Sequence, residues 1–166
     1  GRPVSKFVPA EHLVVPYETS DLATCPCITH VVRTSLNDLR KQQIAGFYRD
    51  IPVLPSQSGS SSISDEIDHI DGVSASNIDY DCTLLEFHAD LDLPGYENKD
   101  EDGEETGIKV PYIVTISEEN SKILAIRRNY EEEDPLTTKI QYFVHYKFLP
   151  GFGFYGLGLI HTIGGL

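Results

Sequence analysis

Short apolar runs alternate with proline and polar residues in the first part of the chain. The runs cover residues 13–15 and 28–32, and they are separated by Pro16 and by a polar stretch that ends in Pro26. Runs of this length, rich in valine and isoleucine and bounded by turn residues, are typical of β-strands. The pattern therefore predicts two short strands within residues 1–34.

A helical period follows these strands. Ser35 precedes Asp38 by three positions, a spacing typical of a capping box, in which the two side chains each accept a free amide of the first helical turn. We predict a helix over residues 36–47. Residues three or four positions apart give it one shared face, formed by Leu36, Leu39, Gln43, Ile44 and Phe47.

Beyond residue 81 the period changes to two. Apolar residues alternate with polar ones over residues 81–93, which predicts a strand with one buried and one wet face. We place His88 on the wet face and expect its side chain to be solvated. The residues expected on the buried face are Thr83, Leu85, Phe87, Ala89, Leu91 and Leu93.

Three further strands are predicted over residues 110–116, 123–130 and 140–148. A tight turn at residues 118–121 joins the first two. In the last of them we expect His145 to be solvated, opposite a face shared by Ile140, Tyr142, Val144, Tyr146 and Phe148.

Together these elements predict an α+β fold in four segments. Residues 1–55 form a strand-strand-helix unit, and residues 56–80 form a serine-rich linker with a short acidic helix marked by Ile63, Ile67 and Ile70. Residues 81–150 form an antiparallel β-meander. Residues 151–166 are rich in glycine and aromatic residues and carry no charge, and such an apolar tail is unusual on a soluble protein.

Negative charge is concentrated in the middle of the chain. The formal net charge is -13, and residues 56–134 hold 21 of the 26 acidic side chains. This balance excludes a surface that grips nucleic-acid phosphates or anionic lipid heads by charge neutralisation. Three cysteines are too few for a disulfide scaffold, and no apolar run approaches the roughly 20 residues that cross a bilayer. We expect a soluble intracellular protein, and the absence of Met together with the apolar tail favours an internal piece of a longer polypeptide.

Residues 151–156 read Gly-Phe-Gly-Phe-Tyr-Gly, which has the glycine spacing of a dinucleotide-binding loop. In such a loop the glycines let a pyrophosphate approach a helix N-terminus inside a βαβ unit. Pro150 and the aromatic residues between the glycines instead favour a sharp turn.

An acidic stretch begins like a calcium-binding EF-hand loop, with Asn98, Asp100 and Asp102 at alternate positions followed by Gly103. The twelfth position is Lys109 where the EF-hand has a bidentate glutamate, and no helices are predicted on either side. A solvated loop between two strands is the favoured interpretation, and a weak cation site at residues 98–105 is the alternative.

Cys25 and Cys27, with His30 and His12 nearby, are the residues most suited to a metal cluster. Their spacing is neither that of a redox motif nor that of a usual zinc site, so small buried residues at the start of a strand are favoured. The remaining histidines are scattered, and no nucleophile motif accompanies them. We therefore expect no catalytic residue, no metal and no cofactor, and hence no enzyme.

The sequence nevertheless resembles one family over most of its length. The stretch at residues 141–156, Gln-Tyr-Phe-Val-His-Tyr-Lys-Phe-Leu-Pro-Gly-Phe-Gly-Phe-Tyr-Gly, and its continuation to residue 166 resemble portal proteins of short-tailed bacteriophages and related prophages. The strand at residues 84–93, the loop with Asp102 and Gly103, and the strands at 110–115 and 123–128 are also similar to that family. Residues 14–50 resemble its preceding strand, Cys-Pro, strand and capped helix.

The resemblance implies a structural subunit of the ring at one capsid vertex through which DNA is packaged and ejected. It implies other portal subunits, terminase and tail adaptor proteins as partners, DNA that passes without specific binding, and no membrane. It places the protein in the virion, and in the bacterial host cytoplasm during assembly. It also implies an internal fragment of a larger portal fold, whose residues 151–166 lead into a helix beyond this chain.

Aromatic residues near the end of the sequence are the candidate interface, either with neighbouring subunits or with other parts of the same chain. A small intracellular binding domain with a weak cation site in the acidic loop is the alternative function. The candidate interface residues are Tyr142, Phe143, Tyr146, Phe148, Phe152, Phe154 and Tyr155.

Overall fold

A computed structural model describes residues 4–55, 82–100, 102–147, 149–151, 154–158 and 163–164. The linker and acidic helix expected over residues 56–80 lie outside these ranges. Among the described residues, no helix is long and apolar enough to cross a membrane.

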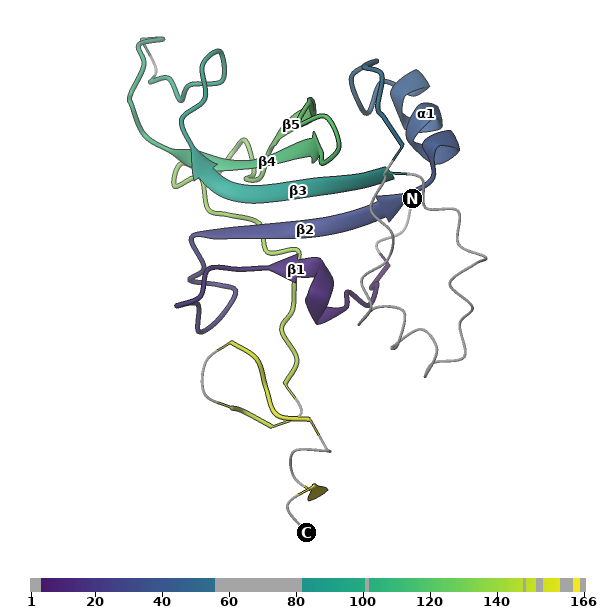
Figure 1. Ribbon diagram of the computed structural model, residues 1–166. Helices are drawn as coiled ribbons and strands as arrows, with labels where there is room; N and C mark the ends of the chain where they lie inside the picture. The colour runs from purple at the N-terminus through teal and green to yellow at the C-terminus, as the bar shows by residue number, and fades with distance from the viewer. Residues whose placement is uncertain are drawn as a thin grey trace. The chain divides into compact units, whose positions relative to one another are not determined.

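An antiparallel sheet of five strands, accompanied by one α-helix, makes the fold α+β, as the sequence predicts (Figure 1). A short 3-10 helix, η1, at Ala10–His12 leads into the sheet, whose strands lie side by side in chain order. The strands are β1 (Leu13–Val14), β2 (Cys27–Thr34), β3 (Cys82–Leu91), β4 (Val110–Ser117) and β5 (Ile123–Arg128).

Two compact units divide the chain, and each is built from separate stretches of sequence. Unit 1 comprises Gly1–Thr29, Phe87–Ile113 and Arg127–Leu166, and unit 2 comprises His30–Glu86 and Val114–Ile126. Strands β2 to β5 each contribute residues to both units. Each unit has its own apolar core.

The helix of unit 2, α1, spans Leu36–Ile44 and begins at the predicted cap, where the Ser35 hydroxyl accepts the Asp38 amide at 3.1 Å. It ends three residues before the predicted position. Gly46 adopts a φ of 76°, and its amide donates to the Gln43 carbonyl while the Phe47 amide donates to the Gln42 carbonyl. This pair of bonds is a Schellman motif, which glycine favours because it lacks the Cβ that is strained at positive φ.

The termination of α1 also changes its buried face. Leu39 and Gln43 are buried as predicted, whereas Ile44 and Phe47 are exposed. The Gln43 side-chain amide donates to the Arg49 and Ile51 carbonyls, which ties the following loop to the helix. The assignment of Ile44 and Phe47 to the shared apolar face was therefore wrong.

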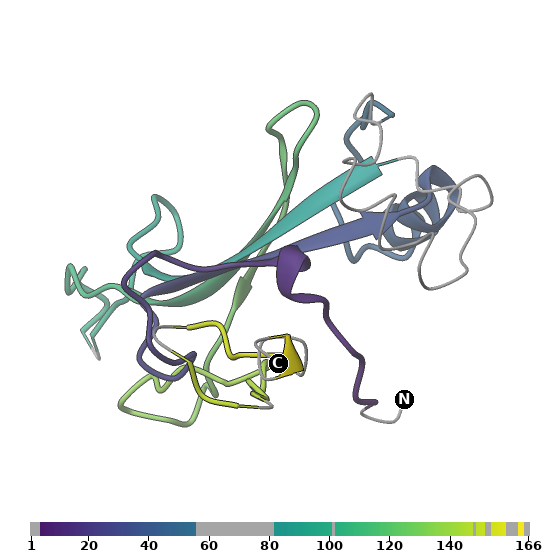
Figure 2. The same cartoon turned by 60° about the horizontal axis from the view of Figure 1, so that its bottom comes forward.

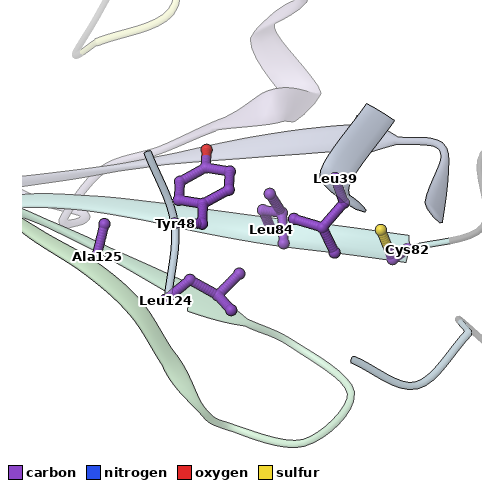
Figure 3. Packing of buried hydrophobic residues seen from close by; sticks show 6 residues of the cluster. All are labelled: Leu39, Tyr48, Cys82, Leu84, Leu124 and Ala125. Atoms are coloured by element: carbon purple, nitrogen blue, oxygen red, sulfur yellow. The ribbon is translucent and has the colours of Figure 1, made fainter. Parts of the chain in front are cut away.

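The Leu124 core of unit 2 joins α1 to the sheet. Figure 3 shows the Leu39 side chain of α1 directed at Leu84 of β3, with Leu124 of β5 beside them. Val32, Leu36, Ile51 and Val53 pack around this core. The six buried members are Leu39, Tyr48, Cys82, Leu84, Leu124 and Ala125.

Strands β4 and β5 form the hairpin predicted from the sequence (Figure 2). The Ser117 amide donates to the Lys122 carbonyl at 2.9 Å and closes the turn. Ser121 takes a φ of 54°, and the Asn120 side-chain oxygen accepts the Lys122 amide. The tight turn at residues 118–121 is therefore confirmed.

The strict alternation predicted for β3 was wrong. Cys82, Thr83 and Leu84 are all buried, and so are His88 and Ala89, whereas Leu85 and Phe87 are only half-buried. The cause is packing by other parts of the chain, since Cys82 and Leu84 lie in the Leu124 core and the Phe143 ring covers His88. Only an open face would have kept the apolar-polar alternation.

The fourth strand of the predicted meander was also wrong. Residues 140–147 are assigned to no strand, and β5 is the last strand in the described residues. The Ile140 amide donates to the Asn129 carbonyl at 3.0 Å, but residues 141–147 belong to none of the five strands of the sheet. Within unit 1 the segment thus lies outside the sheet, and its Phe143 and His145 side chains pack against the core of that unit.

Candidate functional site

The segment at residues 140–147 is the candidate site, because it presents apolar side chains to solvent. Tyr142, Val144 and Tyr146 are 58%, 94% and 87% exposed. Phe143 and His145, between them, are half-buried. This alternation is typical of an extended chain with one packed and one free face. We call Tyr142, Val144 and Tyr146 the tyrosine row.

The packed face of the segment is anchored in the Phe154 core of unit 1. Phe143 lies against this core and meets the His88 ring edge-on, with ring centroids 5.3 Å apart. His145 stacks on Phe154, with centroids 4.2 Å apart and planes 25° apart. The buried members of the core are Leu13, Leu22, Cys25, Ile28 and Phe154.

A second tie holds the same part of unit 1. The Lys139 ammonium donates to the Cys25 carbonyl at 2.9 Å, so the residue before the segment is fixed at the Cys25 loop. Tyr142 meets His88 edge-on at 6.1 Å between centroids. The tyrosine row is thus held in place from behind while its outer surface stays open.

The two histidines predicted to be solvated are instead packed. His88 is buried, and its neighbours Tyr142 and Phe143 supply the covering rings. His145 is half-buried against Phe154. Burial, with a smaller contribution from the Lys147 charge, lowers the pKa of His145 below its ordinary value of 6.5. The expectation of solvated histidines was wrong because the segment turns its odd-numbered residues inward.

This shift predicts a pH dependence of unit 1. As pH falls, His145 binds a proton more readily in the unfolded chain than in the folded chain. The contribution of neutral His145 to stability is therefore present above pH 6.5 and is lost as pH falls through the lowered pKa. We expect the melting temperature to fall between about pH 7.5 and about pH 5.5, and to fall less in His145→Phe, which keeps an aromatic ring on Phe154. An NMR titration of His145 with a midpoint at or above 6.5 would contradict this.

Leu149 and Leu157, in and just before the glycine-rich stretch, lie next to each other. The Leu157 amide donates to the Leu149 carbonyl at 2.9 Å, which brings these two chain segments together. A Cβ atom on Gly156 would lie 2.8 Å from the Leu149 carbonyl oxygen and 3.1 Å from the Lys147 Cβ. Gly156 is therefore required by the close approach of two chain segments, which supports the sharp turn predicted from Pro150 and the aromatic residues.

Hydrogen bonds among its own residues hold the acidic loop together. One Asp100 carboxylate oxygen accepts the amides of Asp102 and Glu104, at 3.0 and 2.9 Å. The Asn98 side-chain amide donates to the Thr106 hydroxyl at 2.9 Å. Among the described residues, no group of three or more His, Cys, Asp or Glu side chains is placed to hold a metal ion. The residues thus form a loop between β3 and β4 that is closed by hydrogen bonds of its own side chains.

We therefore expect no stoichiometric calcium binding by this loop. The twelfth position, where an EF-hand loop supplies a bidentate glutamate, is Lys109, and one oxygen of Asp100 already accepts two amides. The measurement is isothermal titration calorimetry of the chain with calcium chloride. Stoichiometric heat at micromolar calcium, abolished in Asp100→Asn, would instead favour a cation-binding domain.

Cys25, Cys27 and the nearby histidines have separate surroundings. The Cys25 thiol donates to the Cys27 carbonyl at 2.9 Å, and its sulfur lies 3.5 Å from the Thr19 hydroxyl oxygen. His30 contacts the Glu86 carboxylate at 3.0 Å, and His12 lies 3.7 Å from Glu11. Cys25 is buried in the Phe154 core, as expected for a small residue before a strand.

The candidate interface residues fall into two groups. Tyr142, Tyr146 and Tyr155 are exposed, whereas Phe154 is buried and Phe143 half-buried in unit 1. Val144 was not among the candidates although it is the most exposed of the tyrosine row. Its place in the alternation of residues 140–148 could have identified it. Two further candidates, Phe148 and Phe152, lie outside the described residues.

The chain was compared with known proteins. No family model matches the sequence, and no match was found among the curated proteins or the solved structures.

Proposed function

We propose that this chain is part of a portal protein of the short-tailed bacteriophage type, with a structural role in the ring through which DNA is packaged and ejected. The observation that carries the proposal is the stretch at residues 141–158. Its sequence resembles the portal family, and in unit 1 it offers the tyrosine row to solvent while its inward side chains pack in the Phe154 core.

The exposed aromatic residues are suited to contacts within an assembly. Tyrosine buries a large area at low entropic cost, and it is enriched where proteins meet. In this proposal Tyr142, Tyr146 and Tyr155 contact neighbouring subunits or other parts of a longer chain, while Phe143 and Phe154 hold the segment to unit 1. The other partners are terminase and tail adaptor proteins, at a capsid vertex.

The acidic surface of unit 1 is better suited to DNA that passes by than to DNA that is bound. Exposed carboxylates gather in the turn at residues 131–133 and in the acidic loop, at Asp100, Asp102, Glu104 and Glu105. A negative surface repels phosphates, so a duplex that passes close to it is not retained. The role is therefore structural, with no catalytic residue.

Antibodies raised against the purified chain test the proposal. In phage particles from the organism that encodes the chain, immunogold electron microscopy is expected to label one vertex of each capsid. Preimmune serum is the control. Label spread over the whole capsid, or antigen confined to fractions without particles, would contradict the portal role.

A further inference from the structure

The tyrosine row belongs to a main chain that is open to pairing. Among the described residues, the main-chain amides and carbonyls of Tyr142, Val144 and Tyr146 make no hydrogen bond to other protein groups. The side chains alternate between packed and exposed positions, as in a strand, yet the segment has no strand neighbour (Figure 1). An extended segment with unpaired main-chain groups is a template for another strand.

The outward side chains are symmetric about Val144. Reading from Val144 in either direction, the next outward residue is tyrosine, Tyr142 on one side and Tyr146 on the other. If two copies pair antiparallel about Val144, Tyr142 of each copy lies opposite Tyr146 of the other, and the two valines face each other. Aromatic pairs such as Tyr142 with Tyr146 are among the cross-strand pairs that stabilise a sheet. A two-fold axis at Val144 therefore makes the segment complementary to itself.

Charge is compatible with this register. Lys147 lies opposite Gln141 of the second copy, and Lys139 lies opposite Leu149 of the second copy, so no two like charges face each other. Residues 135–166 contain no acidic side chain, so no carboxylate is drawn into the apolar row. The tyrosine row has no charged side chain, so it offers nothing that a different protein could recognise by charge.

We propose that the tyrosine row binds a second copy of this chain by antiparallel strand pairing about Val144. The pairing goes beyond the portal proposal and does not rest on it, because a ring requires head-to-tail contacts whereas this pair is closed by a two-fold axis. The pairing concerns the isolated chain, in which no other protein covers the tyrosine row.

The pair is weak because the row is small. Two tyrosines and a valine with these exposures offer roughly 400 Å² per copy, at about 200 Å² for each aromatic side chain. Doubled, this stays below the approximately 1,200 Å² of a standard stable interface. We expect a dissociation constant on the order of 100 µM. Both copies carry a net charge of -13, so added salt screens their repulsion and strengthens the pair.

Sedimentation velocity of the chain, from about 5 to about 500 µM, measures the pairing. A monomer-dimer equilibrium that tightens with salt is the expected result. Val144→Asp places two carboxylates opposite each other at the axis and should weaken the dimer about tenfold or more. Val4→Asp is the matched control, because Val4 is a valine of unit 1 that is 82% exposed, and it should change the affinity less than about twofold.

A charge-pairing experiment then tests the two-fold register. Val144→Lys alone should also weaken the dimer, whereas a mixture of the Val144→Asp and Val144→Lys chains should form a heterodimer at least as strong as the wild-type dimer. A wild-type monomer at 500 µM, unchanged affinity in Val144→Asp, or no recovery in the mixture would overturn the pairing. Growth beyond a dimer would also overturn it, and the immunogold result would be unaffected by any of these outcomes.

Discussion

Replacing Leu124 by alanine is expected to lower the free energy of unfolding of unit 2 by about 2–5 kcal/mol. Leu124 is 0% exposed, and it packs with Leu39 of α1 and Leu84 of β3 (Figure 3). The alanine would leave a cavity where helix and sheet meet, and a packed core relaxes only partly to fill it. The loss is large because Leu124 contributes to the contact that holds α1 in place.

Ile123 supplies the matched control, because it precedes Leu124 on β5 and is 39% exposed. Ile123→Ala should cost less than about 1 kcal/mol, since a side chain that already meets water loses little on truncation. Urea unfolding followed by far-UV circular dichroism measures both variants, and amide NMR spectra locate the damage. Equal losses in the two variants would show that Leu124 is not a core residue.

Replacing Phe154 by alanine is expected to destabilise unit 1 by about 3–5 kcal/mol. The Phe154 ring is 8% exposed, belongs to the same core as Leu13 and Cys25, and carries the stacked His145 ring. Its removal therefore empties part of the core and also releases the segment that bears the tyrosine row. Hydrogen exchange should accelerate at the amides of η1, of β1 and of residues 140–147.

Tyr155 is the control for this second variant. It is the next residue, is 58% exposed and meets Phe154 edge-on at 5.2 Å between ring centroids. Tyr155→Ala should cost about 1 kcal/mol, the value of one aromatic contact. If Phe154→Ala left hydrogen exchange at residues 140–147 unchanged, the Phe154 core would not be what anchors the segment.

The sequence predicted the elements whose cause is local. The Ser35 cap, the turn between β4 and β5 and the strand character of β1 and β2 each depend on a few adjacent residues. The end of α1 also has a local cause, because glycine at positive φ, here Gly46, commonly ends helices. The prediction nevertheless extended the helix to Phe47, because it followed the apolar period. A glycine after a helical pattern was the better guide.

Features that depend on distant neighbours were not predictable in the same way. The burial of β3 follows from side chains elsewhere in the sequence, such as Leu39 and Phe143, which the periodicity of β3 does not reveal. The alternation at residues 140–147 was correct as a pattern, but a strand also needs a partner strand, and these residues pair with no strand of the sheet. His88 and His145 were misplaced for that reason.

The composition of the Phe154 core has a consequence for the order in which the protein folds. Leu13 and Phe154 come from opposite ends of the described chain, yet they belong to one cluster. During synthesis, the early members of that cluster emerge from the ribosome long before Phe154 does, and contacts of such sequence separation form slowly. Unit 1 is thus completed only once Phe154 has left the ribosome, so its N-terminal apolar residues stay exposed to chaperones and to aggregation until then.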